Sequence, residues 1–165
     1  MNEKFLRLTI HPFKLLIFLF KNLPSAFFSG VRVQYVDGDK CVVTVPYKWF
    51  SRNPFRSTYF ACLSMAAEMS TGVLAMGHSY GQNPPLSMLV LKVEGTFSKK
   101  ATGITTFTCD EGKRIAMAIK ETVSSGKSVS VTVRAVGKNK IDELVADFYL
   151  TWSFKVKAHK KRKSL

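Results

Sequence analysis

The chain has 165 residues, of which 46% are hydrophobic and 12% aromatic, and its formal net charge at pH 7 is +14. This length and composition fit one globular domain with a sizeable core and exclude a disordered chain. The three cysteines, Cys41, Cys62 and Cys109, are too scattered for a disulfide framework or a zinc site, so we interpret them as reduced thiols and expect no metal.

The positive charge predicts an anionic partner, which is nucleic acid, anionic lipid or a phosphorylated small molecule. Six Lys or Arg residues lie within residues 155–163, and residues 158–165 are interpreted as a basic C-terminal tail. No aromatic residue lies between these charges, so base stacking finds no support there. Binding of nucleic acid or a membrane surface through the tail stays open as an alternative.

The first 24 residues contain an apolar stretch at Leu15–Phe20 that is bracketed by Lys14 and Lys21. It is much shorter than the roughly 20 residues of a membrane-spanning helix. A signal peptide is the alternative, although no clear A-x-A cleavage site follows. We predict instead a short amphipathic helix that caps the fold and stops near Pro24, in a cytoplasmic protein.

From residue 30 the hydrophobic pattern has a period of two, which is typical of strands. Residues 30–36 and 41–47 predict a β-hairpin around the turn signal Asp37-Gly38. Three side chains of the first strand are expected to share one face: Val31, Val33 and Tyr35.

A loop that contains Pro54 precedes a predicted helix of about 20 residues. Ser57 or Thr58 is expected to cap its start, and Gly77 to close it. From Ser57 to Gly77 the only charged residue is Glu68.

Residues 86–97 predict a strand that pairs with a second strand at residues 101–109. Residues 110–126 predict an amphipathic helix, and residues 128–137 and 144–157 predict two strands with clean alternation. Four side chains of the strand at residues 86–97 are expected to face together: Leu89, Leu91, Val93 and Phe97.

Strands with one apolar and one polar face are typical of an antiparallel sheet, and the apolar face needs a cover. The long, charge-poor helix is the obvious cover, because small residues along it allow strands to approach closely. We therefore predict an α+β fold in which a curved antiparallel sheet of about six strands wraps around a long central helix. No repeat or linker indicates a second domain, so residues 25–157 are assigned to this one.

Glu68 is the leading functional candidate, because a buried ionised carboxylate needs partners, water or a raised pKa. An ordinary polar contact at the surface or at a subunit interface remains the alternative. The helix start near Thr58–Ala61 offers free backbone N–H groups, and Asn53 lies in the loop before it. Glu68 is roughly 12–15 Å further along the helix, so an antiparallel second subunit would have to bring the two together.

No P-loop, G-x-G-x-x-G or HExxH motif occurs. The element order and the fifteen residues from Asn53 to Glu68 resemble the hotdog fold of acyl-CoA thioesterases, above all its phenylacetate-pathway branch. The stretch Asn53–Gly77 is also similar to a domain of unknown function in that superfamily, whose members are usually described as thioesterases. The resemblance covers roughly Leu23–Lys157.

The resemblance implies a thioester hydrolase in which Glu68 is the general base or nucleophile, Asn53 positions water and the backbone N–H near Phe60 polarises the carbonyl. It also implies a homodimer or dimer of dimers, with coenzyme A bound as part of the substrate and no separate cofactor. From the tail and the short apolar stretch described above, we expect neither nucleic acid nor membrane as the main partner. Further candidates for substrate or coenzyme A contacts are Thr58, Tyr59, Thr71, Arg56, Lys92, Lys99, Lys100 and Arg134.

One departure from the family pattern supports a second hypothesis. Where the family usually has His-Gly-Gly at the helix start, this chain has Thr58-Tyr59-Phe60-Ala61. A protein that binds an acyl chain or acyl-CoA without hydrolysing it is therefore the alternative to the enzyme.

Overall fold

The computed structural model describes residues 1–157, and the predicted basic tail at residues 158–165 lies outside them. The elements in chain order are α1 (Glu3–Ile10), α2 (Pro12–Asn22), α3 (Pro24–Phe28), β1 (Arg32–Val36), β2 (Cys41–Val45), the short 3₁₀ helix η1 (Trp49–Ser51), α4 (Phe60–Ser79), β3 (Leu86–Phe97), β4 (Thr105–Cys109), α5 (Gly112–Ser125), β5 (Val129–Lys138) and β6 (Leu144–Val156).

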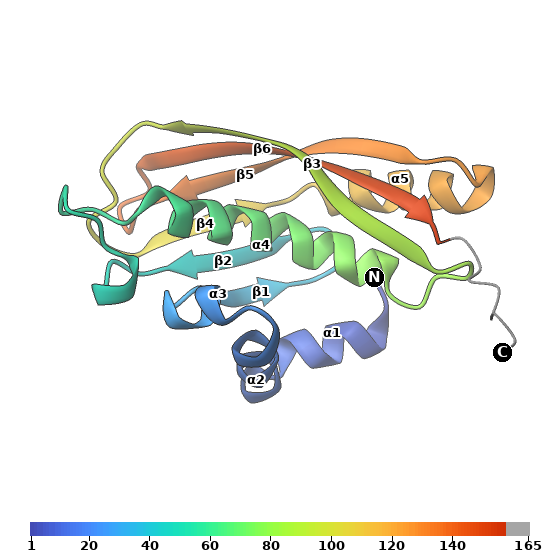
Figure 1. The fold of residues 1–165 in the computed structure, drawn as a ribbon, viewed down its shortest axis with the longest axis horizontal. Coiled ribbons are helices and arrows are strands. Elements are labelled where there is room, and N and C mark those ends of the chain that lie inside the picture. Colours follow the sequence, from blue (N-terminus) through green and yellow to red (C-terminus); the bar gives the residue numbers. More distant parts are fainter. Residues whose placement is uncertain (158–165) are drawn as a thin grey trace, which may run out of the picture.

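The strands form one curved antiparallel sheet in the order β1-β2-β4-β5-β6-β3, and α4 packs along it (Figure 1). The first three helices lie beside the β1 edge of the sheet (Figure 1). This arrangement confirms the predicted α+β fold with a long central helix.

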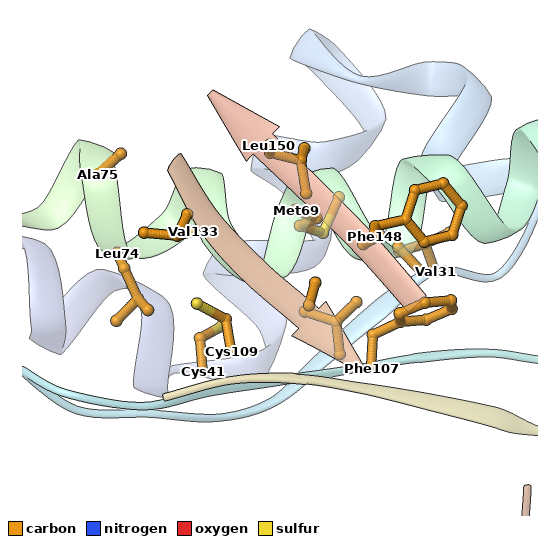
Figure 2. Close-up of a cluster of buried hydrophobic side chains, with 14 of the residues drawn as sticks. Val31, Cys41, Met69, Leu74, Ala75, Phe107, Cys109, Val133, Phe148 and Leu150 are labelled. Carbon is orange, nitrogen blue, oxygen red and sulfur yellow. The ribbon is translucent and has the colours of Figure 1, made fainter. Parts of the chain in front are cut away.

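α4 is buried on most of its circumference because small side chains let the strands approach it. Ala66, Ala67 and Ala75 are fully buried. Met69 and Leu74 of the same helix belong to the core that lies between α4 and the sheet (Figure 2). The strands and the residue before β1 contribute further side chains to this core: Val31, Cys41, Phe107, Cys109, Val133, Phe148 and Leu150. By length and composition α4 is the one helix among the described residues that could cross a membrane, but most of it is buried within the fold.

The start of α4 differs from the prediction. Tyr59 is the N-cap residue, and no side chain caps the helix. The two expected caps are used elsewhere, because the Ser57 hydroxyl donates to Asn53 Oδ1 and the Thr58 hydroxyl to the Ala101 carbonyl. The helix also runs slightly past Gly77, to Ser79.

The predicted pairing of the strands at residues 86–97 and 101–109 is wrong. β3 pairs with β6, and β4 lies between β2 and β5. β3 has 12 residues and pairs along its whole length with the 13-residue β6, an extent of pairing that the five-residue β4 could not provide.

Two predicted strand faces are also wrong, and a β-bulge explains each. The register shifts between Val33 and Tyr35 in β1, so Tyr35 is exposed and Val36 is buried instead. In β3 the register shifts between Val90 and Lys92. An extra residue turns every later side chain to the opposite face. Leu89 therefore pairs with Ser153 on one face, whereas Val93 and Phe97 pair with the buried Leu150 and Ala146 on the other, so the expected residues do not share a face. All four are substantially exposed: Leu89, Leu91, Val93 and Phe97.

The N-terminal segment contains three helices rather than the single predicted one. Pro12 is the first residue of α2, and His11 before it is extended. Pro24 begins α3 in the same way. The residue before a proline is disfavoured in helical conformation, so each proline interrupts the helix and starts a new one.

The contact between α5 and the β1–β2 turn gives a stability test. A Cβ atom on Gly112 would lie 2.3 Å from the Gly38 carbonyl oxygen, and the Gly112 N–H donates to the Asp39 carbonyl at 2.9 Å. We expect Gly112→Ala to lower the free energy of unfolding by about 1–3 kcal/mol in urea titrations, because backbone must move. Gly103→Ala is the control, since nothing lies within 4 Å of its Cβ position. Equal stability of the two variants would contradict this prediction.

Candidate active site

A large open cavity of about 770 Å³ lies at the start of α4. It is formed by the loop between η1 and α4, the first turn of α4, and the segment that follows β3. Six of the residues predicted from the sequence line this one cavity: Asn53, Thr58, Tyr59, Phe60, Lys99 and Lys100.

Asn53 organises the loop that forms this cavity. Its Oδ1 accepts hydrogen bonds from the Phe55 N–H at 3.0 Å, the Ser57 N–H at 3.2 Å and the Ser57 hydroxyl at 3.2 Å. The side-chain oxygen is therefore occupied by the protein itself. Only the amide NH₂ remains as the group that this residue can offer a ligand.

The first turn of α4 brings backbone donors to the same cavity. The first N–H groups of a helix have no partner within the helix, and no side chain caps this one. Phe60 is the first helical residue and lines the cavity. Together with the positive end of the helix dipole, its N–H suits an oxygen atom that develops negative charge.

Aromatic rings surround this helix start. Tyr59 and Phe60 contact each other edge to face at 4.9 Å between ring centroids, and Phe60 also contacts Phe97 at 6.5 Å. All three rings line the cavity and are about half exposed. A ligand that reaches the Phe60 N–H therefore passes between aromatic surfaces.

Glu68 lies in the wall of a second, smaller cavity of about 90 Å³. The wall is otherwise apolar, apart from Thr9, and Glu68 is the one charged residue among the described residues that form it. The other lining residues are Phe5, Thr9, Leu15, Phe18, Leu19, Leu23, Val33, Met69, Gly72, Val73, Met76, Met88 and Trp152.

Burial raises the pKa of the Glu68 carboxyl above its ordinary value, and loss of hydration is the cause. Among the side chains that the structure describes, none donates a hydrogen bond or forms an ion pair to this carboxyl group. A half-buried carboxyl group without a cationic partner holds its proton more tightly and is a stronger base once ionised.

Gly72, one turn after Glu68, leaves room for the carboxyl group. A Cβ atom at Gly72 would lie 2.9 Å from Glu68 Oε1 and 3.3 Å from the Trp152 ring. Trp152 is itself held in place, because its Nε1–H donates to the Thr71 hydroxyl at 3.0 Å. The carboxyl group thus lies between its own helix and the β6 side chain.

Within one chain the two cavities are separate, and the predicted residues divide between them. Asn53 and Phe60 line the large cavity and Glu68 lines the small one. Phe60 and Glu68 are eight residues apart, or about 12 Å by helical rise. One chain therefore does not bring the three predicted catalytic residues together around one substrate atom.

Thr71, a predicted substrate contact, lines neither of these cavities. It is fully buried, and its hydroxyl donates to the Glu68 carbonyl and accepts from Trp152. Thr71 therefore connects α4 to Trp152 of β6 through a hydrogen bond.

The five predicted coenzyme A cations differ in how they are held. Lys92 pairs with Glu94, Lys99 with Glu143, and Arg134 forms a bidentate pair with Asp147. Arg56 and Lys100 are exposed and form no ion pair with any residue that the structure describes. Only Lys99 and Lys100 line the large cavity.

Sequence reasoning missed the contribution of the N-terminal helices to the small cavity. Phe5 and Thr9 of α1 and Leu15 and Leu19 of α2 form part of its wall. The apolar stretch of the N-terminal segment was visible in the sequence, but nothing in its pattern indicated which surface it covers. Within the described residues no cluster of His, Cys, Asp or Glu suits a metal ion.

The raised pKa of Glu68 predicts a pH-dependent effect of Glu68→Gln. Because the folded-state pKa lies above the unfolded one, the wild type loses stability as pH rises through the folded-state value. We expect the neutral variant to be more stable than the wild type at neutral pH, with a gain that shrinks under acidic conditions. Urea titrations across pH measure this, and Glu121→Gln on the exposed side of α5 serves as control. A gain that does not depend on pH would contradict the prediction.

No family model and no curated protein matches this sequence.

Several solved structures do match the fold of this chain. A protein of unknown function from Pseudomonas aeruginosa, described as a probable thioesterase, is 18% identical with a TM-score of 0.73 and covers 88% of this chain and 97% of its own. A protein of unknown function from Chlorobaculum tepidum is 15% identical with a TM-score of 0.74, covering 90% and 99%. A thioesterase from Haemophilus influenzae is 11% identical with a TM-score of 0.62, covering 90% and 94%. Likeness at these identities concerns architecture, and it confirms that the chain has the hotdog fold.

Proposed function

We propose that the protein is a homodimeric thioesterase that hydrolyses an acyl-CoA-type thioester with Glu68 as its base. The observation that carries the proposal is a half-buried carboxyl group with a raised pKa in the wall of an apolar cavity. Structural neighbours named thioesterases support the same reaction class.

In this mechanism Glu68 accepts a proton from water, and the water oxygen forms a bond to the thioester carbonyl carbon. The Phe60 N–H at the start of α4 stabilises the oxyanion of the resulting tetrahedral intermediate. When the C–S bond breaks, Glu68 returns its proton to the departing sulfur, so that a carboxylic acid and a free thiol are released. Direct attack by the Glu68 carboxylate is the second route to the same products.

The mechanism needs residues from both cavities, and a dimer formed through β3 would bring these residues together. Among the described strands β3 pairs only with β6, so its other edge is open. The strand has twelve residues, and several of its apolar side chains are exposed to solvent; Leu89 is 63% exposed and Leu91 is 56% exposed. A long apolar edge of this kind favours pairing with a second copy.

The two ends of β3 adjoin different cavities. Met88, near its start, lines the Glu68 cavity, and Phe97, at its end, lines the large cavity. In an antiparallel two-fold pairing, the end of one β3 lies beside the start of the other. The Asn53 and Phe60 of one chain would then meet the Glu68 of the partner.

The remaining parts of the substrate have suitable surroundings in this arrangement. The apolar wall around Glu68 suits the acyl chain, and Lys99 and Lys100 at the large cavity suit the phosphates of coenzyme A. A non-catalytic acyl-CoA binder is the second candidate, because the rings of Tyr59 and Phe60 narrow the approach to the helix N–H groups.

The catalytic proposal is tested with Glu68→Gln in a thiol-release assay over short, long and aromatic acyl-CoAs. We expect kcat/KM to fall at least about 100-fold, because the base is lost. Glu121→Gln on α5 should retain full activity. The wild-type rate should rise with pH through a pKa above that of free Glu. Full activity of Glu68→Gln would refute the mechanism, and acyl-CoA binding without thiol release would establish the binder.

The dimer proposal is tested by placing charge on the open edge. We expect Leu89→Lys combined with Leu91→Lys to give a folded monomer in light scattering, without thioesterase activity, because lysines oppose pairing of this edge. Met117→Lys, at a position 62% exposed on α5, is the control. A stable dimer of the double variant would contradict the assigned interface.

Complementation then shows whether two chains share a site. Co-expressed Glu68→Gln and Asn53→Asp chains should form an active mixed dimer, since one of its two sites has both native residues. Asn53→Asp keeps the oxygen that holds the loop and removes the amide donor. Absence of activity in the mixed dimer would argue that each site is built from one chain.

A further inference from the structure

Five aromatic side chains from three separate elements form one continuous, largely exposed group, which we call the aromatic patch. It comprises Phe20 of α2, Phe27 and Phe28 of α3, and Trp49 and Phe50 of η1. Consecutive ring centroids are 5.2 Å apart for Phe20–Phe27, 5.3 Å for Phe27–Phe28, 5.6 Å for Phe28–Phe50 and 4.7 Å for Trp49–Phe50. In Figure 1, α2 and α3 lie below β1, which is at the opposite edge of the sheet from β3.

Four of the five rings of the aromatic patch are more than half exposed. Trp49 is 69% exposed, Phe50 60%, Phe20 53% and Phe28 51%. Single exposed apolar side chains are common, but contiguous groups mark a surface that contacts something else. The exposed apolar surface of the same helices continues through Phe13, Ile17 and Leu23.

The charge of these segments has one sign. Residues 4–36 and 40–67 contain no Asp or Glu. Lys14 and Lys21 near the two ends of α2 are exposed, as are Lys48 and Arg52 on either side of η1. In addition, the Arg32 guanidinium lies 5.0 Å from the centre of the Phe27 ring.

We propose that the aromatic patch docks this protein on an anionic lipid bilayer. Phe and Trp rings enter the boundary between headgroups and acyl chains, and the neighbouring lysines and arginines contact lipid phosphates. α2 lies in the interface, with Leu15 and Leu19 packed on the protein and Ile17 and Phe20 directed outward. This inference replaces the expectation from sequence that a membrane is not a partner.

Two features favour a bilayer over other partners. The aliphatic residues Ile17 and Leu23 extend the surface beside the rings, and such groups enter lipid but do not stack on bases. A symmetric contact between two aromatic patches would bring lysines and arginines of both copies together without a carboxylate from residues 4–36 or 40–67. A bilayer with anionic headgroups provides an apolar layer for the exposed rings and aliphatic side chains and phosphates for the neighbouring lysines and arginines.

Docking in this way also places the large cavity beside the bilayer. η1 continues into the loop that carries Asn53 and Phe55, and Phe55 is 74% exposed at the cavity. The Arg52 and Thr58 backbones join the two sides of this loop in a β-bridge. Substrates with apolar chains dissolved in the membrane surface would therefore lie near the cavity.

The test uses the full-length protein with vesicles of phosphatidylcholine alone and of phosphatidylcholine mixed with phosphatidylglycerol. We expect co-sedimentation with the anionic vesicles that is at least about tenfold stronger than with neutral ones and weakens with salt. The chain has two tryptophans, of which Trp152 is 4% exposed and Trp49 69% exposed. Fluorescence should therefore shift to shorter wavelength on binding, and the Trp49→Phe variant should bind without this shift.

Paired variants separate the apolar from the charged contribution. Trp49→Ser with Phe50→Ser should weaken vesicle binding at least about tenfold, whereas Met117→Ser, equally exposed on α5, should not. Lys14→Gln with Lys21→Gln should weaken binding to anionic vesicles. Lys120→Gln with Lys127→Gln removes the same charge from an exposed region around α5 and should not.

Three results would overturn the proposal. The first is a wild-type protein that does not bind anionic vesicles. The second is equal binding by the Trp49→Ser, Phe50→Ser variant and the wild type. The third is evidence that the aromatic patch binds a different partner. A lower oligomeric mass of the Trp49→Ser, Phe50→Ser variant in light scattering would indicate a contact between copies of the chain. Loss of oligonucleotide binding by the same variant would indicate that the partner is nucleic acid.

Discussion

The close approach of the curved sheet to α4 is the constraint on which the rest of the structure depends. It requires small residues along the helix, and Ala66, Ala67 and Ala75 are accordingly buried without exposed surface. The same packing leaves Glu68 between the helix, the N-terminal helices and Trp152. Loss of hydration there raises the pKa of the carboxyl group, so the packing that stabilises the fold also produces the property on which the proposed role of Glu68 rests.

A single chain holds the residues of the proposed site apart because of the length of α4, and β3 offers a way to bring them together in a dimer. The helix dictates that its start and Glu68 are two turns apart, so the two cavities open at different positions along it. β3 runs from one cavity to the other with an open apolar edge. A two-fold axis through the middle of that edge is the simplest operation that joins unlike ends of the same strand.

The positive charge of the chain is distributed unevenly, and ion pairs account for the difference. Several cations on the strands and their turns are paired with carboxylates, as in Arg134 with Asp147 and Lys138 with Asp142. The segments that carry the aromatic patch contain no carboxylate to do the same, since residues 4–36 and 40–67 lack Asp and Glu. The surplus charge there is thus available to an anionic surface.

The elements with strong periodicity could be predicted from the residues alone: the hairpin around Asp37-Gly38, the long helix with its single carboxylate, and the alternation of β5 and β6. Their patterns are local, so no distant residue was needed to interpret them. Which strand pairs with β3, which side chains face inward after the two β-bulges, and what the N-terminal helices cover became clear only in the folded chain. Strand partners are chosen by length and packing across the whole sheet, and a bulge reverses side-chain direction without leaving a mark in the hydrophobic pattern. For the same reason the sequence indicated Asn53, Phe60 and Glu68 as candidates, whereas their separation into two cavities became visible only in the folded chain.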